Sequence, residues 1–162
     1  MPALLTFADL TERAEILHRE TENTLVETGE QVPMLAMFGA RSGILPYSAF
    51  GRLIQDEAVT MAVRALAATG LMMIGLAQRA TVLLGTEHQP VAAVHHRREP
   101  GDAGLELWSI AVHRDDAHAV SHLTPVHRAG GGFTVGERSR TVKAVCCDPD
   151  AQRLMAILAA SR

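Results

Sequence analysis

Histidine is the residue type with chemical potential that is distributed most unevenly along this chain. Seven of the eight histidines lie between residues 88 and 127, and His118 and His122 are four residues apart in the segment Asp115–His122. On a helix these two side chains would share a face one turn apart, which is the spacing of a chelating pair. On a strand they would be roughly 13 Å apart, at about 3.3 Å per residue, too far for one metal ion. Because the alternation from Val120 to Val126 fits a strand at least as well, the sequence leaves both conformations open.

A catalytic metal site would need more than this pair of histidines. Zinc sites of the hydrolytic kind bring three protein ligands to one ion, and no His-Glu-x-x-His or Cys-x-x-Cys pattern is present. His95 and His96 are neighbours on an expected strand, so they must point to opposite sides of the sheet. We expect His95 to pair across a hairpin near Trp108, as a packed pair or as a stacking site for a flat ligand. The preferred interpretation is that the histidines are exposed or satisfied in the core, and it predicts no metal ligands and no cofactor.

The candidate nucleophiles also lack a catalytic setting. They are Ser109, Ser121, Ser139 and the adjacent Cys146 and Cys147. None of the serines lies in a Gly-x-Ser-x-Gly elbow. The cysteines immediately precede an expected helix, which could lower a thiol pKa, but small buried residues at a strand end explain them more simply. We therefore assign no catalytic residue.

A basic, glycine-rich segment has the composition of an anion-binding loop. His127–Gly132 is followed by Arg138, Arg140 and Lys143, but no Gly-x-x-x-x-Gly-Lys pattern is present and no helical pattern follows the glycines. The net charge of −3 also argues against a sequence-independent nucleic-acid binder, which usually carries a basic balance. A solvated hairpin loop is the better interpretation of this segment.

Three helices are expected to position these residues. Thr6 and Asp9 have the spacing of a capping box at the start of a helix near 6–28. A second helix, near 48–69, is apolar around most of its circumference, is expected to be buried and is expected to end at Gly70. The unbroken apolar run Leu71–Leu76 then predicts a strand covered on both faces. Asp148 followed by Pro149 predicts the start of a closing helix over 149–160.

The order of elements predicts one α+β domain over residues 1–162. Short strands and turns are grouped after the second helix, and Val91–Arg97 with Leu105–His113 is expected to form a hairpin. Grouped strands favour a mostly antiparallel sheet, packed with an N-terminal, a central buried and a C-terminal helix. Two adjacent cysteines and the absence of a secretion signal or a long apolar span favour a soluble, cytoplasmic protein that does not bind membranes.

The sequence favours a small interaction or regulatory module without catalytic activity. Val91–Val94, Trp108 and Ile110 supply more apolar strand surface than three helices are expected to cover, which favours a homodimer or a protein partner. The alternative is a metal- or His-dependent hydrolase that uses His113–His122 with Asp115 or Asp116. Nucleic-acid binding is a third and weaker hypothesis; its basic residues are Arg128, Arg138, Arg140 and Lys143. The residues alone name no substrate, partner or pathway.

Overall fold

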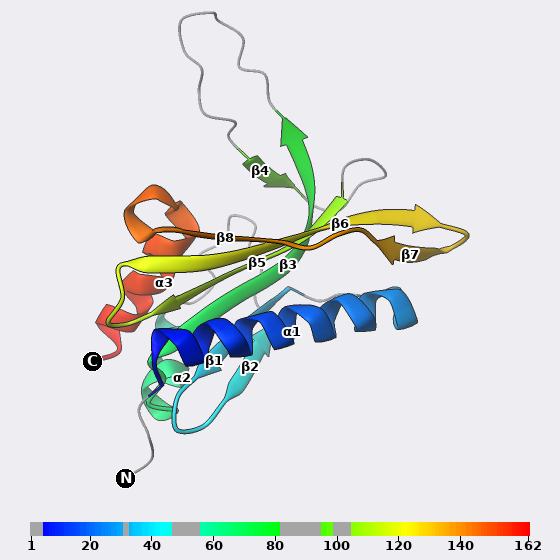
Figure 1. Cartoon of the computed structure of the whole chain (residues 1–162). Coiled ribbons are helices and arrows are strands. Elements are labelled where there is room, and N and C mark those ends of the chain that lie inside the picture. The colour runs from blue at the N-terminus through cyan, green and yellow to red at the C-terminus, as the bar shows by residue number, and fades with distance from the viewer. Residues whose placement is uncertain (1–4, 31–32, 47–55, 82–94, 99–104) are drawn as a thin grey trace, which may run out of the picture.

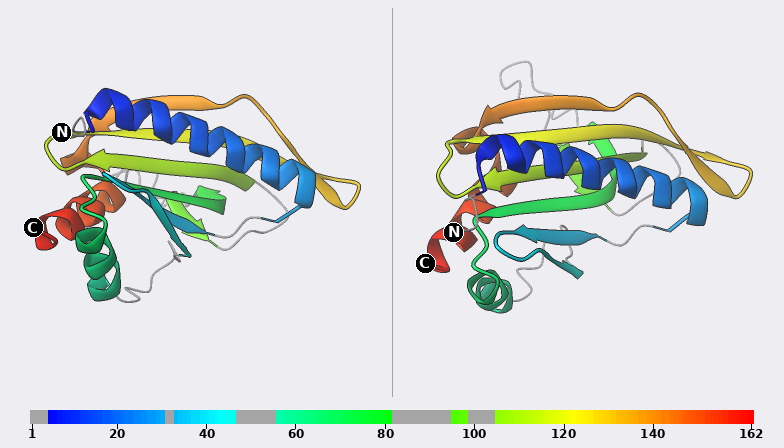
Figure 2. Two further views of the ribbon diagram at one scale, coloured as in Figure 1. Left: turned by 90° about the horizontal axis from the view of Figure 1, so that it is seen from below. Right: turned by 60° about the horizontal axis from the view of Figure 1, so that its bottom comes forward.

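The computed structural model describes residues 5–30, 33–46, 56–81, 95–98 and 105–162. In these residues an antiparallel sheet of eight strands has one long helix, α1 (Phe7–Thr28), along one face. Two shorter helices, α2 (Asp56–Ala65) and α3 (Pro149–Ala160), gather at one end of the opposite face (Figures 1 and 2). This arrangement confirms the predicted α+β fold with a mostly antiparallel sheet.

Helix α1 begins and ends where its sequence predicts. The Thr6 hydroxyl accepts a hydrogen bond from the Asp9 amide at 3.1 Å, and the Asp9 carboxylate accepts one from the Thr6 amide at 2.9 Å. Gly29, at φ 71°, ends the helix in the left-handed conformation that glycine adopts readily. The face toward the sheet buries Leu10, Ala14 and Leu25, together with a polar side chain, His18.

The sheet has the order β2-β1-β3-β5-β6-β7, with β4 paired to β3 and β8 paired to β6. Every strand pairing in the described residues is antiparallel. The strands are β1 (Met34–Phe38), β2 (Gly43–Pro46), β3 (Gly70–Thr81), β4 (His95–Arg98), β5 (Leu105–His113), β6 (His118–Ala129), β7 (Gly132–Val135) and β8 (Ser139–Ala144).

Residues 70–76 of strand β3 are buried, with side chains toward both faces of the sheet, as the run Leu71–Leu76 predicts. Met72, Ile74 and Leu76 belong to the apolar core under α1, whereas Leu71 and Met73 belong to the core under α2 and α3. Successive strand side chains point to opposite faces, so β3 divides the interior into two cores. Strand β5 is likewise buried along all nine of its residues, and its side chains also enter both cores.

Helix α2 ends earlier and is less buried than the sequence predicts. It spans Asp56–Ala65, and the expected residues 48–55 lie outside those described. Val59 and Val63 are buried, but Met61 is 65% exposed, so only one face packs on the sheet. Gly70 is the first residue of β3 and does not end the helix; a Cβ there would lie 2.8 Å from the Cδ1 of Leu10. The glycine thus makes room for α1.

The predicted hairpin is paired differently. Strand β4 pairs with β3, where His95 lies opposite Thr81. Trp108 lies opposite Gly75 of β3 and Leu123 of β6, so the expected pairing of His95 near Trp108 is wrong. Val91–Val94 and the predicted loop 99–104 lie outside the described residues. The long strand β3 pairs with both β4 and β5. The short-range pattern of the sequence did not indicate this.

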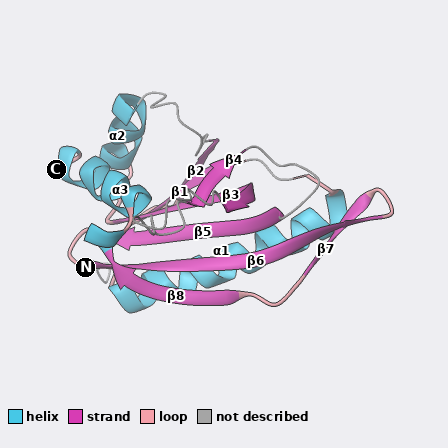
Figure 3. Ribbon diagram, turned by 90° about the horizontal axis from the view of Figure 1, so that it is seen from above, coloured by secondary structure: helices cyan, strands magenta, loops and turns pink. Residues whose placement is uncertain are grey.

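Helix α3 closes the chain against α2 (Figure 3). A single 3-10 turn, Val145–Cys147, leads from β8 into it. As predicted, Asp148 caps the helix: its Oδ1 accepts hydrogen bonds from the amides of Asp150 and Ala151 at 2.9 and 3.0 Å. The other carboxylate oxygen lies 2.7 Å from Lys143 Nζ, so the same side chain anchors α3 to β8.

Candidate functional site

A buried polar network lies between α1 and the sheet. His18 is fully buried on α1, with Nδ1 2.8 Å from Ser109 Oγ on β5 and Nε2 2.8 Å from Thr124 Oγ1 on β6. Thr124 donates a hydrogen bond of 2.6 Å to Glu22, one turn after His18 on α1. Arg138 then donates from Nη1 to both carboxylate oxygens of Glu22, each at 3.1 Å. These contacts tie α1 to β5, to β6 and to the segment before β8.

The hydrogen bonds determine which nitrogen of His18 carries the proton. Thr124 has one hydroxyl proton and donates it to Glu22, so its oxygen accepts from His18 Nε2. Nδ1 is then unprotonated and accepts from the hydroxyl of Ser109. Burial, assisted by the neighbouring His122 and Arg138, lowers the pKa of His18 to about 3. The ring is therefore neutral at physiological pH.

Hydrogen bonds are donated from serine to histidine, from histidine to threonine and from threonine to glutamate, an order that superficially resembles a nucleophile with its base. Ser109 is only 1% exposed and lies beneath α1. It lines none of the three surface hollows described below. A nucleophile must reach a substrate carbonyl or phosphoryl group, so this geometry favours a structural role for the network.

His122 lies beside this network but forms no hydrogen bond with its members. It lies opposite Ser109 on β6, and its ring centroid is 5.4 Å from that of His18. Both ring nitrogens are buried and have no hydrogen-bond partner within the described part of the chain. Burial is the main cause that lowers the pKa of His122, opposed by Glu15 and assisted by Arg138. Its neutral ring packs in the core.

The structure separates the histidines of the His113–His122 segment. Residue 118 begins strand β6, so the choice left open by the sequence is decided in favour of a strand. His113 Nε2 lies 2.7 Å from the carbonyl oxygen of Leu5, whereas His118 is exposed beside Asp116, with 3.3 Å between Nδ1 and Oδ1. His122 points into the core. No group of three or more His, Cys, Asp or Glu side chains that could hold a metal occurs among the residues described.

Cys146 and Cys147 are exposed, so the interpretation of them as small buried residues is wrong. They lie in the 3-10 turn, where the chain leaves the sheet. Their Sγ atoms are 3.8 Å apart. The hydrogen bond with Cys146 is the main cause that raises the pKa of the Cys147 thiol, while Lys143 lowers it. For Cys147, the lowered pKa considered from sequence is therefore also wrong.

Most of the basic residues of the segment considered as an anion-binding loop have partners in the protein. Arg138 is paired with Glu22, Lys143 with Asp148, and the guanidinium of Arg128 lies 5.4 Å from the ring centre of Phe133. Gly130 and Gly131 adopt positive φ angles in the turn between β6 and β7, as expected for a hairpin loop.

The apolar strand face that the sequence analysis assigned to a partner is covered within the chain. Trp108, Ile110 and Val112 are each at most 1% exposed and form one core with Val59, Val63 and residues of α3. The expectation of uncovered apolar surface at these positions is wrong, because α2 and α3 pack over them. Val94 lies outside the described residues.

A different apolar surface remains open, in a groove between α1 and the strands β1 and β2. One hollow of about 210 Å³ has apolar walls formed by Ile16 and Leu17 on one side and Phe38 and Ile44 on the other. Ile16 is 45% exposed and Ile44 is 53% exposed. Because exposed aliphatic side chains line both sides of this hollow, the groove is a candidate contact surface.

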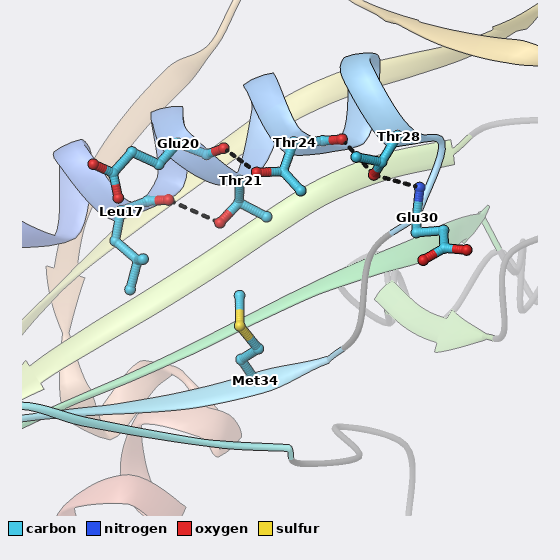
Figure 4. A pocket seen from close by; sticks show the side chains of 7 residues that line it. All are labelled: Leu17, Glu20, Thr21, Thr24, Thr28, Glu30 and Met34. Atoms are coloured by element: carbon cyan, nitrogen blue, oxygen red, sulfur yellow. Dashed lines mark hydrogen bonds between the residues drawn. The ribbon is translucent and has the colours of Figure 1, made fainter.

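A second hollow, of about 440 Å³, shares Leu17 and Glu20 with the first and extends toward the end of α1 (Figure 4). The hydroxyls of Thr21, Thr24 and Thr28 on its wall donate to the backbone carbonyls four residues earlier, at 2.8, 3.0 and 2.8 Å. Because these hydroxyls are already bonded, the threonines offer methyl groups for contact. The two hollows thus form one largely apolar groove, here called the α1 groove.

The helix side of the α1 groove carries one charge of each sign. Arg13, Ile16, Leu17 and Glu20 line it, at spacings that put them on one helix face. Arg13 lies three residues before Ile16, and Glu20 lies three residues after Leu17. Neither forms an ion pair within the described part of the chain, unlike Arg19, which contacts Glu15 at 3.4 Å on the neighbouring face.

No helix in the described residues is long and apolar enough to cross a membrane. Comparisons with protein-family models, with curated proteins and with solved structures find no match to this chain.

Proposed function

We propose that this protein is a self-associating interaction module without catalytic activity, and that a second copy of the chain occupies the α1 groove. The observation that carries the proposal is the self-complementary stripe Arg13, Ile16, Leu17 and Glu20, set beside the exposed Ile44. The buried position of Ser109 supports the non-catalytic part.

The stripe fits a two-fold symmetric contact. If two α1 helices pack antiparallel about an axis between Ile16 and Leu17, residues equally far from the axis meet. Arg13 of one copy then faces Glu20 of the other, and the reverse pair forms at the same time, as symmetry demands of an isologous interface. Ile16 of each copy then meets Leu17 of the other at the axis, and this contact covers Ile44 in the groove beside it. Both apolar side chains lose contact with water, which favours association by about 25 cal/mol per Å² buried.

Light scattering and sedimentation of the full chain over a range of concentrations test the proposal. We expect a dimer of twice the chain mass of 17.4 kDa. Ile16→Asp and Ile44→Asp should each give monomers, because a carboxylate would be buried in an apolar contact. The folded state of each variant is checked by circular dichroism.

Val26→Asp is the matched control, because Val26 is also on α1 and is 45% exposed, like Ile16, but does not line the groove. It should remain dimeric. A native chain that is monomeric at every concentration would overturn the proposal. So would a dimer that dissociates with Val142→Asp on the edge strand β8 and not with Ile16→Asp, since Val142 is an alternative exposed apolar residue.

A further inference from the structure

The adjacent cysteines form a surface feature that the α1 groove does not involve. Cys146 and Cys147 are the only two cysteines of the chain, and both are exposed in the turn between β8 and α3. Their Sγ atoms lie 3.8 Å apart. Two accessible thiols on neighbouring residues of one turn are a potential chelate for a thiophilic ion.

The backbone that carries the thiols is held in place on both sides. The amide of Val145 donates to the carbonyl of Ala117 at 2.8 Å, and the amide of Asp148 donates to the carbonyl of Val145 at 3.1 Å. Gln152 Nε2 donates to the carbonyl of Cys146 at 2.7 Å. The cap of α3 thus fixes the turn, and a metal ion would not have to order it on binding.

We propose that Cys146 and Cys147 bind one Zn²⁺ ion as a dithiolate chelate at the protein surface. Zinc–sulfur bonds of about 2.3 Å at a tetrahedral angle place two sulfurs about 3.8 Å apart, and this is the separation observed. A linear two-coordinate ion would instead require the sulfurs at twice the bond length. Binding replaces the two thiol protons, which are released to solvent, by two bonds to the ion.

The remaining coordination positions are open to water. A hollow of about 520 Å³ borders the turn and is lined by Cys146, Met155, Gln152, His118 and Asp116 among others. No three His, Cys, Asp or Glu side chains converge within metal reach in the described residues, so the two thiolates alone are the protein ligands.

Titration of the reduced, untagged full chain with Co²⁺ tests the site, since a sulfur-to-cobalt charge-transfer band reports thiolate ligation. We expect the near-ultraviolet band to saturate at one Co²⁺ per chain and to disappear when Zn²⁺ displaces the cobalt. Cys146→Ser and Cys147→Ser should each weaken binding by at least about tenfold, because a single thiolate cannot chelate. His118→Ala, a change on the same hollow, should retain the native affinity.

Three results would overturn the proposal. The first is the absence of a charge-transfer band. The second is saturation at one Co²⁺ per two chains, which would mean that the ion bridges molecules. The third is loss of binding in His118→Ala with both thiols intact. Circular dichroism checks that each variant is folded; all three side chains are exposed.

Discussion

His18 illustrates how one buried side chain organises the contact between helix and sheet. It is fully buried, donates from Nε2 to Thr124 and accepts from Ser109 at Nδ1. Buried polar groups are tolerated when they are hydrogen-bonded and are costly when they are not. Glu22 accepts hydrogen bonds from both Thr124 and Arg138. Removal of one member of the network therefore leaves others without that partner.

Glu22→Gln should therefore destabilise the fold. The change removes the charge that pairs with Arg138. The hydroxyl of Thr124 would then donate to a neutral amide oxygen instead of a carboxylate. We expect the free energy of unfolding to fall by about 1–3 kcal/mol, measured by urea denaturation. Glu27→Gln on the exposed side of α1 is the control and should stay within about 0.5 kcal/mol of the native protein. An equal effect of the two changes would contradict a structural role for the network.

His18 should also make stability depend on pH. Its pKa is about 3 in the folded protein and about 6.5 when unfolded, so between these values only the unfolded chain binds the proton. Stability is then fully present above pH 6.5 and decreases as the pH falls. We expect His18 to account for a loss of about 2 kcal/mol between pH 7.5 and 5.

Urea denaturation at a series of pH values measures this dependence. His18→Gln should reduce the loss between pH 7.5 and 5 by about 2 kcal/mol, whereas His127→Gln at an exposed position should leave it unchanged. A native pH dependence in the His18 variant would show that His18 is not the group responsible.

The sequence contained only one local sign of this network. His18 and Glu22 stand four residues apart, so a helix places them on one face, but Ser109, Thr124 and Arg138 come from strands and loops about a hundred residues away. Their meeting depends on the register of β5 against β6 and on the position of α1 across the sheet. Both are long-range properties that residue spacing does not contain.

At the scale of elements, local chemistry predicted the helix ends best. The capping box of α1 and the Asp148–Pro149 start of α3 depend on residues within one turn, and both are present in the structure. The partner of β4 and the exposure of α2 depend on distant strands, and there the sequence failed. Met61 is apolar yet 65% exposed because the residues that cover the sheet face are Val59 and Val63.

Asp148 provides a test at this scale, because it both caps α3 and pairs with Lys143. Asp148→Ala should lower the free energy of unfolding by about 1–2 kcal/mol. Asp148→Asn should lose less, since its side-chain oxygen still accepts from the amides of Asp150 and Ala151. Equal losses in the two variants would show that the charge, and not the cap, is what matters; urea denaturation separates the two cases.

At the scale of the whole molecule, the two cores contain the buried hydrophobic side chains of the described residues. Helix α1 covers one face of the sheet, and α2 with α3 cover part of the other (Figure 2). The sequence predicted these three helices and the antiparallel sheet. It also predicted an uncovered apolar surface around Trp108, but that face is buried. Ile16 and Ile44 are exposed on opposite sides of the α1 groove, whereas the exposed Val26 and Val142 do not line it.

Charge reversal at the α1 groove tests the proposed two-fold contact most directly. Arg13→Glu and Glu20→Arg should each weaken the dimer, since either change sets like charges against each other twice in one interface. Surface pairs contribute about 0.2–1 kcal/mol each, so we expect the dissociation constant from sedimentation to rise by about two- to thirtyfold. High salt should reduce the difference.

The double variant Arg13→Glu/Glu20→Arg restores opposite charges across the two-fold axis and should recover the native dissociation constant. No such recovery is expected if the two residues bind separate partners or do not meet. A double variant as weak as, or weaker than, the single variants would contradict the antiparallel α1 contact on which the proposed function depends.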